Sequence, residues 1–349
     1  MQKANSLRHL NLLVTGGAGF IGSNFVEKAV HRGHQIVILD SLTYAGHREN
    51  LDGITGPGQF ELVIGNICNK KLLADLFEKY RFDALINFAA ESHVDRSIAG
   101  PAPFIETNIG GTYNLLNVSL SYWQKMHDSK KENFRFLHVS TDEVYGSLGP
   151  EGKFNEKTPM APNSPYSASK ASADLLTRAW HHTFGLPTLT TNCSNNYGPR
   201  QFPEKLIPHM ITCALQEKPL PVYGDGGNIR DWIHVSDHCH GILLALEKGK
   251  SGATYCFGGD AERKNIDLVQ TLCNHLDQLR PRKNGESYNK LITFVKDRLG
   301  HDKRYAIDDS LSRIELSFTR QYQFESGLEN TIRWYLENSR WAKSVLSKG

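Results

Sequence analysis

The sequence predicts an α/β protein built on a Rossmann-type doubly wound parallel sheet, with a smaller mixed α/β substrate lobe at the C-terminal end. Short apolar runs alternate with amphipathic stretches through the first half of the chain, and this βαβα order produces a parallel sheet with helices on both faces. The first apolar run leads directly into a glycine-rich turn, which is typical of dinucleotide-binding folds.

The spacing of the apolar residues places the expected elements in order along the chain. Strands are expected at residues 11–14, 35–39, 60–64, 84–88, 134–139 and 188–192. Helices are expected between them at 21–32, 69–80, 103–122 and 165–184. After Asn195, proline and glycine turn signals replace long strands. Helices are expected there at 204–217, 236–248, 265–279 and 325–338, with a polar loop at 283–290.

These elements divide the chain into a first domain, residues 1–198, and a second lobe, residues 199–349, some segments of which return to the first domain.

The composition excludes several classes of function. In 349 residues, 40 Lys and Arg oppose 37 Asp and Glu, a formal charge of +3. No run of like charge exceeds Lys130-Lys131, so no nucleic-acid-binding surface is expected.

The six cysteines are scattered without a C-x-x-C pair, so neither a disulfide framework nor a metal site is expected. No stretch approaches the roughly 18 to 20 apolar residues of a membrane span. The N-terminal apolar run is too short for a signal peptide. We therefore expect a soluble, cytoplasmic protein with reduced thiols.

The glycine-rich turn lies between the first expected strand and the first expected helix. Gly16, Gly19 and Gly22 let the backbone approach a pyrophosphate, and the free N–H groups at the helix start favour the anion. The second strand ends at Asp40, 18 residues after Gly22, where a carboxylate can accept hydrogen bonds from ribose hydroxyls. Its charge repels a 2′-phosphate and residues 41–43 offer no arginine, so we expect NAD rather than NADP as the cofactor.

Tyr166 and Lys170 stand four residues apart at the start of an expected helix, so both side chains lie on one face. A nearby ammonium stabilises tyrosinate and lowers the pKa of the phenol towards that of a general base. The chain contains no other Tyr-x-x-x-Lys, and this one follows the glycine turn. Together the two features predict an alcohol-oxidising site.

Thr141-Asp142-Glu143 follows a strand directly, at the carboxyl end where ligands bind in open α/β sheets. Two such acids are often only solvated or cap a helix. An elimination reaction, however, needs a base for a carbon-bound proton and an acid for the departing hydroxyl. Adjacent carboxyl groups can divide these tasks if their environments separate their pKa values.

From about Leu12 to Asp308, the sequence resembles the nucleoside-diphosphate-sugar 4,6-dehydratases, which are extended short-chain dehydrogenases/reductases. The resemblance is highly specific in combination because it runs through many separate segments. The similar segments are residues 15–22, Asp40 with 42–46, 89–97, 140–146, 166–170, 192–199, 203–208, 230–232 and 300–302.

The resemblance implies NAD-dependent dehydration of dTDP-glucose to dTDP-4-keto-6-deoxyglucose, by C4 oxidation, elimination of water across C5 and C6, and hydride return to C6. It implies that Tyr166, supported by Lys170 and Thr141, takes the proton of the sugar 4-hydroxyl. Glu143 then removes the C5 proton while Asp142 protonates the leaving 6-hydroxyl. The choice of thymidine rests on the resemblance alone.

The resemblance also assigns binding residues. Together with the glycine turn, the cofactor is expected to contact Gly16, Gly19, Phe20, Ile21, Gly22, Asp40, Leu42, Thr43, Asn66, Ile67, Phe88, Ala89, Ala90, Glu91, Ser92, Thr107, Tyr166, Lys170 and Asn196. The nucleotide sugar is expected to contact Ser92, Thr141, Asn195, Lys205, Leu206, Pro221, Tyr223, Arg230, Asn265, Arg298 and His301. Arg230 has the clearest physical reason, since a guanidinium fork matches a diphosphate.

Two positions depart from the family pattern. Asn66 stands where Asp is usual, although its amide oxygen can still accept from the adenine amine. Leu299 stands where Pro is usual, which affects the expected rigidity of a loop near the base and with it nucleotide selectivity. His93 is expected to be structural. The resemblance further implies a homodimer through the helices near 103–122 and 165–184.

Two other functions stay open. A UDP-sugar 4-epimerase or a decarboxylase of the same superfamily shares the glycine turn, Tyr166 and Lys170. Neither enzyme needs an acid and a base for elimination, so Asp142 and Glu143 argue against both. A non-catalytic nucleotide-sugar sensor on the same fold is the other alternative, and the complete set of reacting side chains argues against it.

Overall fold

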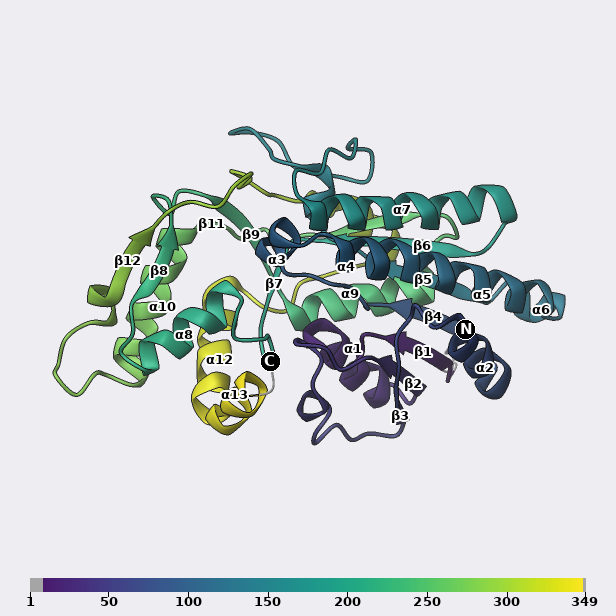
Figure 1. The fold of residues 1–349 in the computed structure, drawn as a ribbon, viewed down its shortest axis with the longest axis horizontal. Helices are drawn as coiled ribbons and strands as arrows, with labels where there is room; N and C mark the ends of the chain where they lie inside the picture. The colour runs from purple at the N-terminus through teal and green to yellow at the C-terminus, as the bar shows by residue number, and fades with distance from the viewer. Residues whose placement is uncertain (1–8, 348–349) are drawn as a thin grey trace, which may run out of the picture.

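The computed structural model describes residues 9–347; the first eight and last two residues of the two expected domains lie outside this part. Its main layer is a seven-stranded sheet whose described strands are all parallel, in the order β10-β6-β5-β4-β1-β2-β3 (Figure 1). The parallel sheet expected from the sequence is confirmed. Its strands are β1 (Asn11–Thr15), β2 (Gln35–Asp40), β3 (Gln59–Ile64), β4 (Ala84–Asn87), β5 (Arg135–Val139), β6 (Thr188–Cys193) and β10 (Thr254–Phe257).

The direction of winding reverses at β1, which pairs with β2 on one side and with β4 on the other. At such a switch point the connections leave towards opposite faces and open a crevice at the carboxyl ends of the strands. The glycine turn at residues 16–19 leaves β1 at this edge, and the loop after β4 lies beside it. The topology therefore brings these two loops together.

Helices cover both faces of the sheet. α1 (Phe20–His31), α9 (Val235–Lys248) and α11 (Ser310–Leu316) pack on one face, and α2 (Lys70–Tyr80), α5 (Thr112–Gln124) and α7 (Pro165–Phe184) pack on the other. In Figure 1, α7 and α5 lie side by side in the upper part of the molecule, and α9 lies next to α1 further down. In β1, Leu12 and Val14 belong to the α1 core and Leu13 to the α5 core, so this central strand is buried on both faces, as a parallel sheet requires.

α7 begins and ends at strong signals. Ser167 N donates to Ser164 Oγ at 3.0 Å, Pro165 is the first helical residue, and Gly185 ends the helix at a φ of 74°. The helix expected at 165–184 is confirmed.

The helix expected at 103–122 is interrupted. The chain forms α4 (Ala102–Phe104), then a π-helical turn (Ile105–Gly111), then α5. A Cβ at Gly111 would lie 2.4 Å from Ile67 Cδ1, so only glycine lets this wider turn pack closely on Ile67. The apolar spacing alone does not reveal the inserted turn.

The second lobe contains, within the described chain, a three-stranded sheet and a two-stranded sheet. Figure 1 shows β8, β12 and α10 at the end of the molecule farthest from the parallel sheet. The strands are β7 (Asn195–Tyr197), β9 (Ile229–His234) and β11 (Glu262–Lys264) in one sheet and β8 (Leu220–Tyr223) and β12 (Ile292–Val295) in the other. The helices are α8 (Leu206–Leu215), α10 (Asn265–Leu279), α12 (Phe324–Glu337) and α13 (Ser339–Leu346).

None of the strands from β7 to β12 was predicted from the sequence, because proline and glycine turn signals dominate the chain after Asn195. These strands have three to six residues each. β10 pairs with β6 and α9 packs on α1, so residues 235–257 lie with the parallel sheet. The end of the expected loop at 283–290 is ordered into a 3-10 helix, Tyr288–Leu291, and Tyr288 N donates to Asp277 Oδ1 at 2.9 Å. Other short helices are α3 (Val94–Ala99), α6 (Asp128–Lys131) and two 3-10 helices, Arg48–Asn50 and Asp142–Tyr145.

None of the helices in the described chain combines the length and the apolar character needed to cross a bilayer.

A buried carboxylate joins the parallel sheet to the second lobe. Asp231, in β9, accepts hydrogen bonds from Ser194 Oγ, from Ala261 N at 2.8 Å and from Gly259 N at 3.0 Å. Ser194 follows β6 and Gly259 follows β10, so one side chain ties the second lobe to the parallel sheet.

We expect Asp231→Asn to lower the free energy of unfolding by about 2 to 4 kcal/mol, because an amide N–H would face a backbone N–H inside the protein. Urea denaturation followed by circular dichroism measures the change. Asp52→Asn, at an exposed position, is the matched control and should stay within about 0.5 kcal/mol of the unmodified protein. Equal stability of the two variants would show that the carboxylate does not join the layers.

Candidate active site

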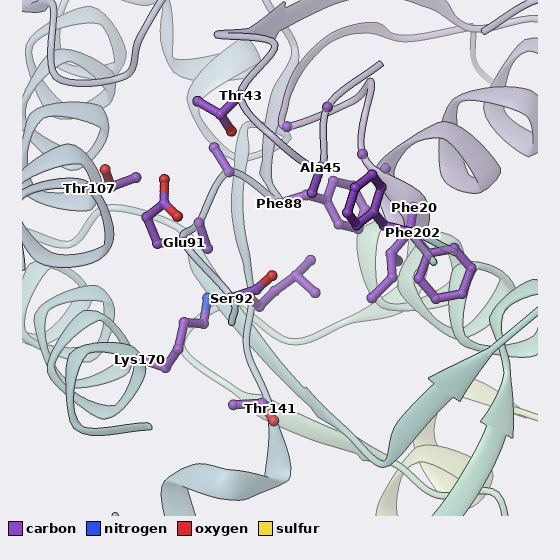
Figure 2. Close-up of a pocket in the computed structure, with 18 of the residues that line it drawn as sticks. Phe20, Thr43, Ala45, Phe88, Glu91, Ser92, Thr107, Thr141, Lys170 and Phe202 are labelled. Carbon is purple, nitrogen blue, oxygen red and sulfur yellow. Dashed lines mark hydrogen bonds between the residues drawn. The ribbon is translucent and has the colours of Figure 1, made fainter. Parts of the chain in front are cut away.

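Two adjoining cavities open at the carboxyl ends of the parallel strands. The first, of about 320 Å³, lies over the glycine turn, and the second, of about 590 Å³, lies between this edge and the second lobe. Figure 2 shows the first cavity, with Thr141 and Lys170 on one side and Phe20, Phe88 and Phe202 on the other. Residues that line both cavities are Ser92, Glu143, Asn195, Asn196, Gln201, Phe202, Glu204 and Lys205.

The glycine turn is packed too closely for side chains. A Cβ at Gly16, where φ is 69°, would lie 2.6 Å from Ala89 N, and a Cβ at Gly22 would lie 2.2 Å from Gly16 O. No side chain caps the start of α1, so the N–H groups of its first turn face the cavity without a partner within the helix. The turn therefore offers the backbone donors that bind a pyrophosphate.

Asp40 is fixed beside this turn. Its Oδ2 accepts from Ala18 N at 2.9 Å and its Oδ1 from Leu42 N at 2.8 Å. Burial raises the pKa of this carboxyl, and the two backbone hydrogen bonds oppose the rise. Each oxygen keeps a further lone pair for a ribose hydroxyl. Of the residues expected to contact the cofactor, only Leu42 does not line the cavity; its N–H orients Asp40 instead.

Asn66 lines the cavity, but its Oδ1 already accepts from Cys68 N at 2.8 Å. This bond closes a local turn and leaves one lone pair of the amide oxygen for a ligand. The departure from Asp thus keeps an acceptor but removes the charge.

Asn108 was not identified from the sequence. From the π-helical turn, its Nδ2 donates to Glu91 O at 3.0 Å and to Ser169 Oγ at 2.8 Å, while its Oδ1 accepts from Glu91 N at 2.8 Å. These bonds join the loop after β4 to α7. Because Thr107, the neighbouring residue, lines the cavity, the same turn shapes the wall.

Tyr166 and Lys170 reach the first cavity from α7, as expected. Lys170 Nζ donates to Val139 O at 2.7 Å, and burial lowers the pKa of Lys170 to about 8. Burial raises the pKa of Tyr166 well above its usual value, and Glu143 adds to the rise. The expected lowering of the phenol pKa by Lys170 is absent from this arrangement, because the ammonium binds a carbonyl and carboxylates face the phenol.

The two acids have different surroundings. Thr141 Oγ1 accepts from Glu143 N at 3.3 Å and starts a 3-10 turn, Asp142–Tyr145. Asp142 is 1% exposed, and its Oδ2 has no hydrogen-bond partner in the described chain. Burial, followed by the charge of Glu143, raises the pKa of Asp142 well above its usual value. Asp142 therefore keeps its proton as the pH rises past the ordinary range of a carboxyl group.

Glu143 is partly exposed to the cavities. Burial raises the pKa of Glu143 as well, but the positive charges of Arg230 and Lys205 lower it. The pair therefore offers a neutral carboxyl group beside one that ionises more readily, which is the separation that acid and base catalysis need.

The second cavity is lined by every residue expected to bind the nucleotide sugar except Thr141, which lines the first. Two buried acceptors of this set have no hydrogen-bond partner in the described chain, Asn195 Oδ1 and Asn265 Oδ1. Such atoms require a polar ligand or water. The cavity thus suits a ligand rich in hydrogen-bonding groups.

The cations of this cavity are held by the protein itself. Arg230 Nη2 donates to Asp302 O at 2.8 Å, and its guanidinium lies over the Tyr305 ring at 4.3 Å. Arg298 Nε lies 2.6 Å from Asp95 Oδ1. Both guanidiniums are therefore oriented, with part of their donor capacity already used.

His93 has more contact with the site than the sequence analysis expected. Its Nδ1 accepts from Arg96 N at 3.3 Å at the start of α3, which is a structural role. The side chain also lines the second cavity, where its Nε2 lies 3.4 Å from Glu204 Oε2. It belongs to the segment 89–97, which was singled out by its resemblance. Other lining residues that were not predicted include Gln201, Phe202, Glu204, Trp232 and Tyr305.

Comparison with known proteins assigns the family. A family model described as GDP-mannose 4,6 dehydratase matches residues 13–331. A dTDP-glucose 4,6-dehydratase of Xanthomonas campestris pv. campestris (strain B100) is 56% identical over 334 residues, 96% of this chain and 95% of that protein. The chain belongs to the NDP-sugar 4,6-dehydratase family.

Solved structures share the whole fold. A dTDP-glucose 4,6-dehydratase from Bacillus anthracis in complex with NAD has a TM-score of 0.85 and 43% identity, over 96% of this chain and 99% of that chain. A UDP-glucose 4-epimerase from Thermotoga maritima with UDP-glucose has a TM-score of 0.83 and 26% identity, over 94% and 99%. Dehydratases and epimerases thus have one architecture, and only the reacting side chains can distinguish them.

We expect the Asp142 carboxyl to keep its proton to a higher pH than an ordinary aspartic acid, because burial opposes its ionisation. A pH titration followed by difference infrared spectroscopy should show a C=O band of a protonated carboxylic acid that persists above the ordinary range of a carboxyl group and is lost in Asp142→Asn. The exposed control Asp52→Asn should keep the band. If no band that depends on Asp142 persists above the ordinary range, the assignment of Asp142 as an acid is contradicted.

Proposed function

We propose that this chain is an NAD-dependent hydro-lyase that converts dTDP-glucose to dTDP-4-keto-6-deoxyglucose. The observation that carries the proposal is the pair Asp142 and Glu143, in which one buried carboxyl keeps its proton beside a second that ionises more readily. Full-length similarity to dTDP-glucose 4,6-dehydratases supports the substrate.

The first cavity fits NAD. Its glycine turn has no room for side chains, its helix start is uncapped, and Asp40 offers acceptors where no arginine is available for a 2′-phosphate. NAD bound there supplies a hydride acceptor for C4, a hydride donor for C6 and, while oxidised, a positively charged ring. Since the hydride returns, the cofactor is unchanged after each turnover.

The residues of this chain then divide the proton transfers. Tyr166 Oη accepts the proton of the sugar 4-hydroxyl and must be ionised to do so, although burial and the neighbouring acids raise its pKa. Positive charge that favours the tyrosinate would come from the oxidised ring of bound NAD and from the ammonium of Lys170 on the same face of α7. The C4 ketone acidifies C5, whose proton passes to Glu143. Asp142 gives its proton to the 6-hydroxyl, which leaves as water. The intermediate lacks one water and carries a C5=C6 double bond until C6 receives the hydride and C5 receives a proton from Glu143 or solvent.

The decisive experiment supplies NAD and, in separate reactions, dTDP-glucose, UDP-glucose and GDP-mannose, and identifies the products by mass. We expect loss of one water from dTDP-glucose, with one deuterium at C5 when the reaction runs in heavy water. Glu143→Gln should lower kcat by about 100- to 10,000-fold because the C5 base is lost.

Glu151→Gln, at an exposed position, is the matched control and should keep full activity. Unchanged mass with inverted C4 would instead make the protein an epimerase, and loss of carbon dioxide from a UDP-sugar acid, supplied in a further reaction, would make it a decarboxylase. Tight binding of NAD and nucleotide sugar without turnover would favour the sensor.

We also infer a homodimer formed through α5 and α7, which lie side by side on the outside of the molecule (Figure 1). Four large apolar side chains on this layer are exposed to solvent in the single chain, which is typical of an interface. They are Ile105, Tyr113, Leu175 and Phe184.

The six free thiols, four of them buried, support a reducing compartment such as the cytoplasm.

Leu175→Glu should convert the dimer to a monomer, because a charge would be buried at the centre of the interface. Sedimentation equilibrium measures the mass. Ile314→Glu, on α11 at the opposite face and 79% exposed, is the control and should leave the mass unchanged. A monomeric unmodified protein, or a dimeric Leu175→Glu, would rule out this interface.

A further inference from the structure

A group of buried polar side chains lies behind Lys170, away from both cavities. His138 Nε2, in β5, lies 3.5 Å from Lys170 Nζ and 3.3 Å from Asp174 Oδ1. Asp174 stands four residues after Lys170 on α7, so both lie on one face of the helix. His138 and Asp174 are 1% and 2% exposed and line neither cavity, so neither can touch a ligand there.

Hydrogen bonds fix the imidazole in its neutral form. Asn87 Oδ1 accepts from Thr15 Oγ1 at 2.6 Å, which turns its Nδ2 towards His138 Nδ1 at 3.1 Å. His138 Nδ1 is therefore an acceptor, and the ring proton lies on Nε2, facing Asp174. Burial and the ammonium of Lys170 lower the pKa of His138 to about 4, so the ring carries no charge near neutral pH.

Asp174 is the charged member of the group. Its Oδ2 accepts from Asn192 Nδ2 at 3.1 Å, and the same amide nitrogen donates to Thr141 O at 3.0 Å. Its Oδ1 faces the Nε2–H of His138 at 3.3 Å. A buried carboxylate is costly unless a cation faces it, and Lys170, whose Nζ lies 3.5 Å from the same ring nitrogen, is that cation.

We propose that Asp174, which faces Lys170 across the imidazole of His138, is a positioning residue that keeps Lys170 protonated and its ammonium at the reacting end of the site. The proposal rests on the proposed function, in which the charge of Lys170 supports Tyr166. Asn192 links the same carboxylate to the backbone of Thr141. One buried anion thus orders both the lysine and the turn that carries the acid and the base.

The groups that face Lys170 come from three elements: Asp174 and Tyr166 from its own helix, His138 from β5 and Cys193 from β6. Burial lowers the pKa of Lys170 to about 8, while Asp174 raises it. Lys170 is charged below its pKa, so activity should fall as the pH rises through about 8. Without the carboxylate this fall should begin at a lower pH.

The test compares pH profiles of kcat and kcat/KM for the full chain with NAD and dTDP-glucose. Asp174→Asn should move the alkaline fall down by about one pH unit, so that kcat is about fivefold to tenfold lower at pH 8.5 and within about threefold at pH 6. KM should change less than about twofold, since neither residue lines a cavity. Asp174→Glu, which keeps the charge, should restore most of the alkaline activity.

Asp237→Asn is the matched control, since this carboxylate is equally buried and accepts from Gln321 N and Tyr322 N far from Lys170. It should lower stability without moving the alkaline fall. An equal loss at every pH in Asp174→Asn would overturn the proposal in favour of a purely structural role. If the variant does not fold, the unmodified protein decides, because a profile without a fall between about pH 7 and 9 would exclude a titrating Lys170. Absence of any dehydration at pH 7 would instead refute the proposed function.

Discussion

Removal of water from ionisable side chains is the constraint on which this site depends. Burial is the leading cause of the pKa changes of Asp142, Tyr166 and Lys170. The same effect disfavours every charged form. It therefore keeps the proton on the Asp142 carboxyl group and makes the Lys170 ammonium lose its proton more easily. The chemistry then depends on the few neighbouring charges that modify this common effect.

The two layers of the fold create this dry environment together. The parallel sheet supplies the floor and the glycine turn, while Asp231 and Asn108 hold the second lobe and the loop after β4 against it. Both buried side chains accept hydrogen bonds from backbone N–H groups that have no partner within a helix or a strand. The walls are therefore fixed by hydrogen bonds as much as by apolar packing.

Local signals made much of this predictable. The apolar spacing predicts the helix at 165–184, whose bounds the Ser164 cap and the Gly185 stop explain in the structure, and Asp142 with Glu143 can be recognised as a pair because they follow a strand. The place of β10 beside β6 could not be read from the sequence, since the two strands are separated by about sixty residues and their pairing depends on tertiary packing. For the same reason the sequence could not show that Lys170 binds a carbonyl, nor that Asp174 lies behind it.

The π-helical turn at Ile105–Gly111 makes two surfaces depend on one stretch of backbone. It carries Thr107 into the cofactor cavity, and α5, with exposed Tyr113, continues directly from it. A π-helical turn holds about one residue more than an α-helical turn, so deleting one residue would close it towards an α-helical turn. Thr107 in the cavity wall and the outer face of α5 would then change their alignment with each other.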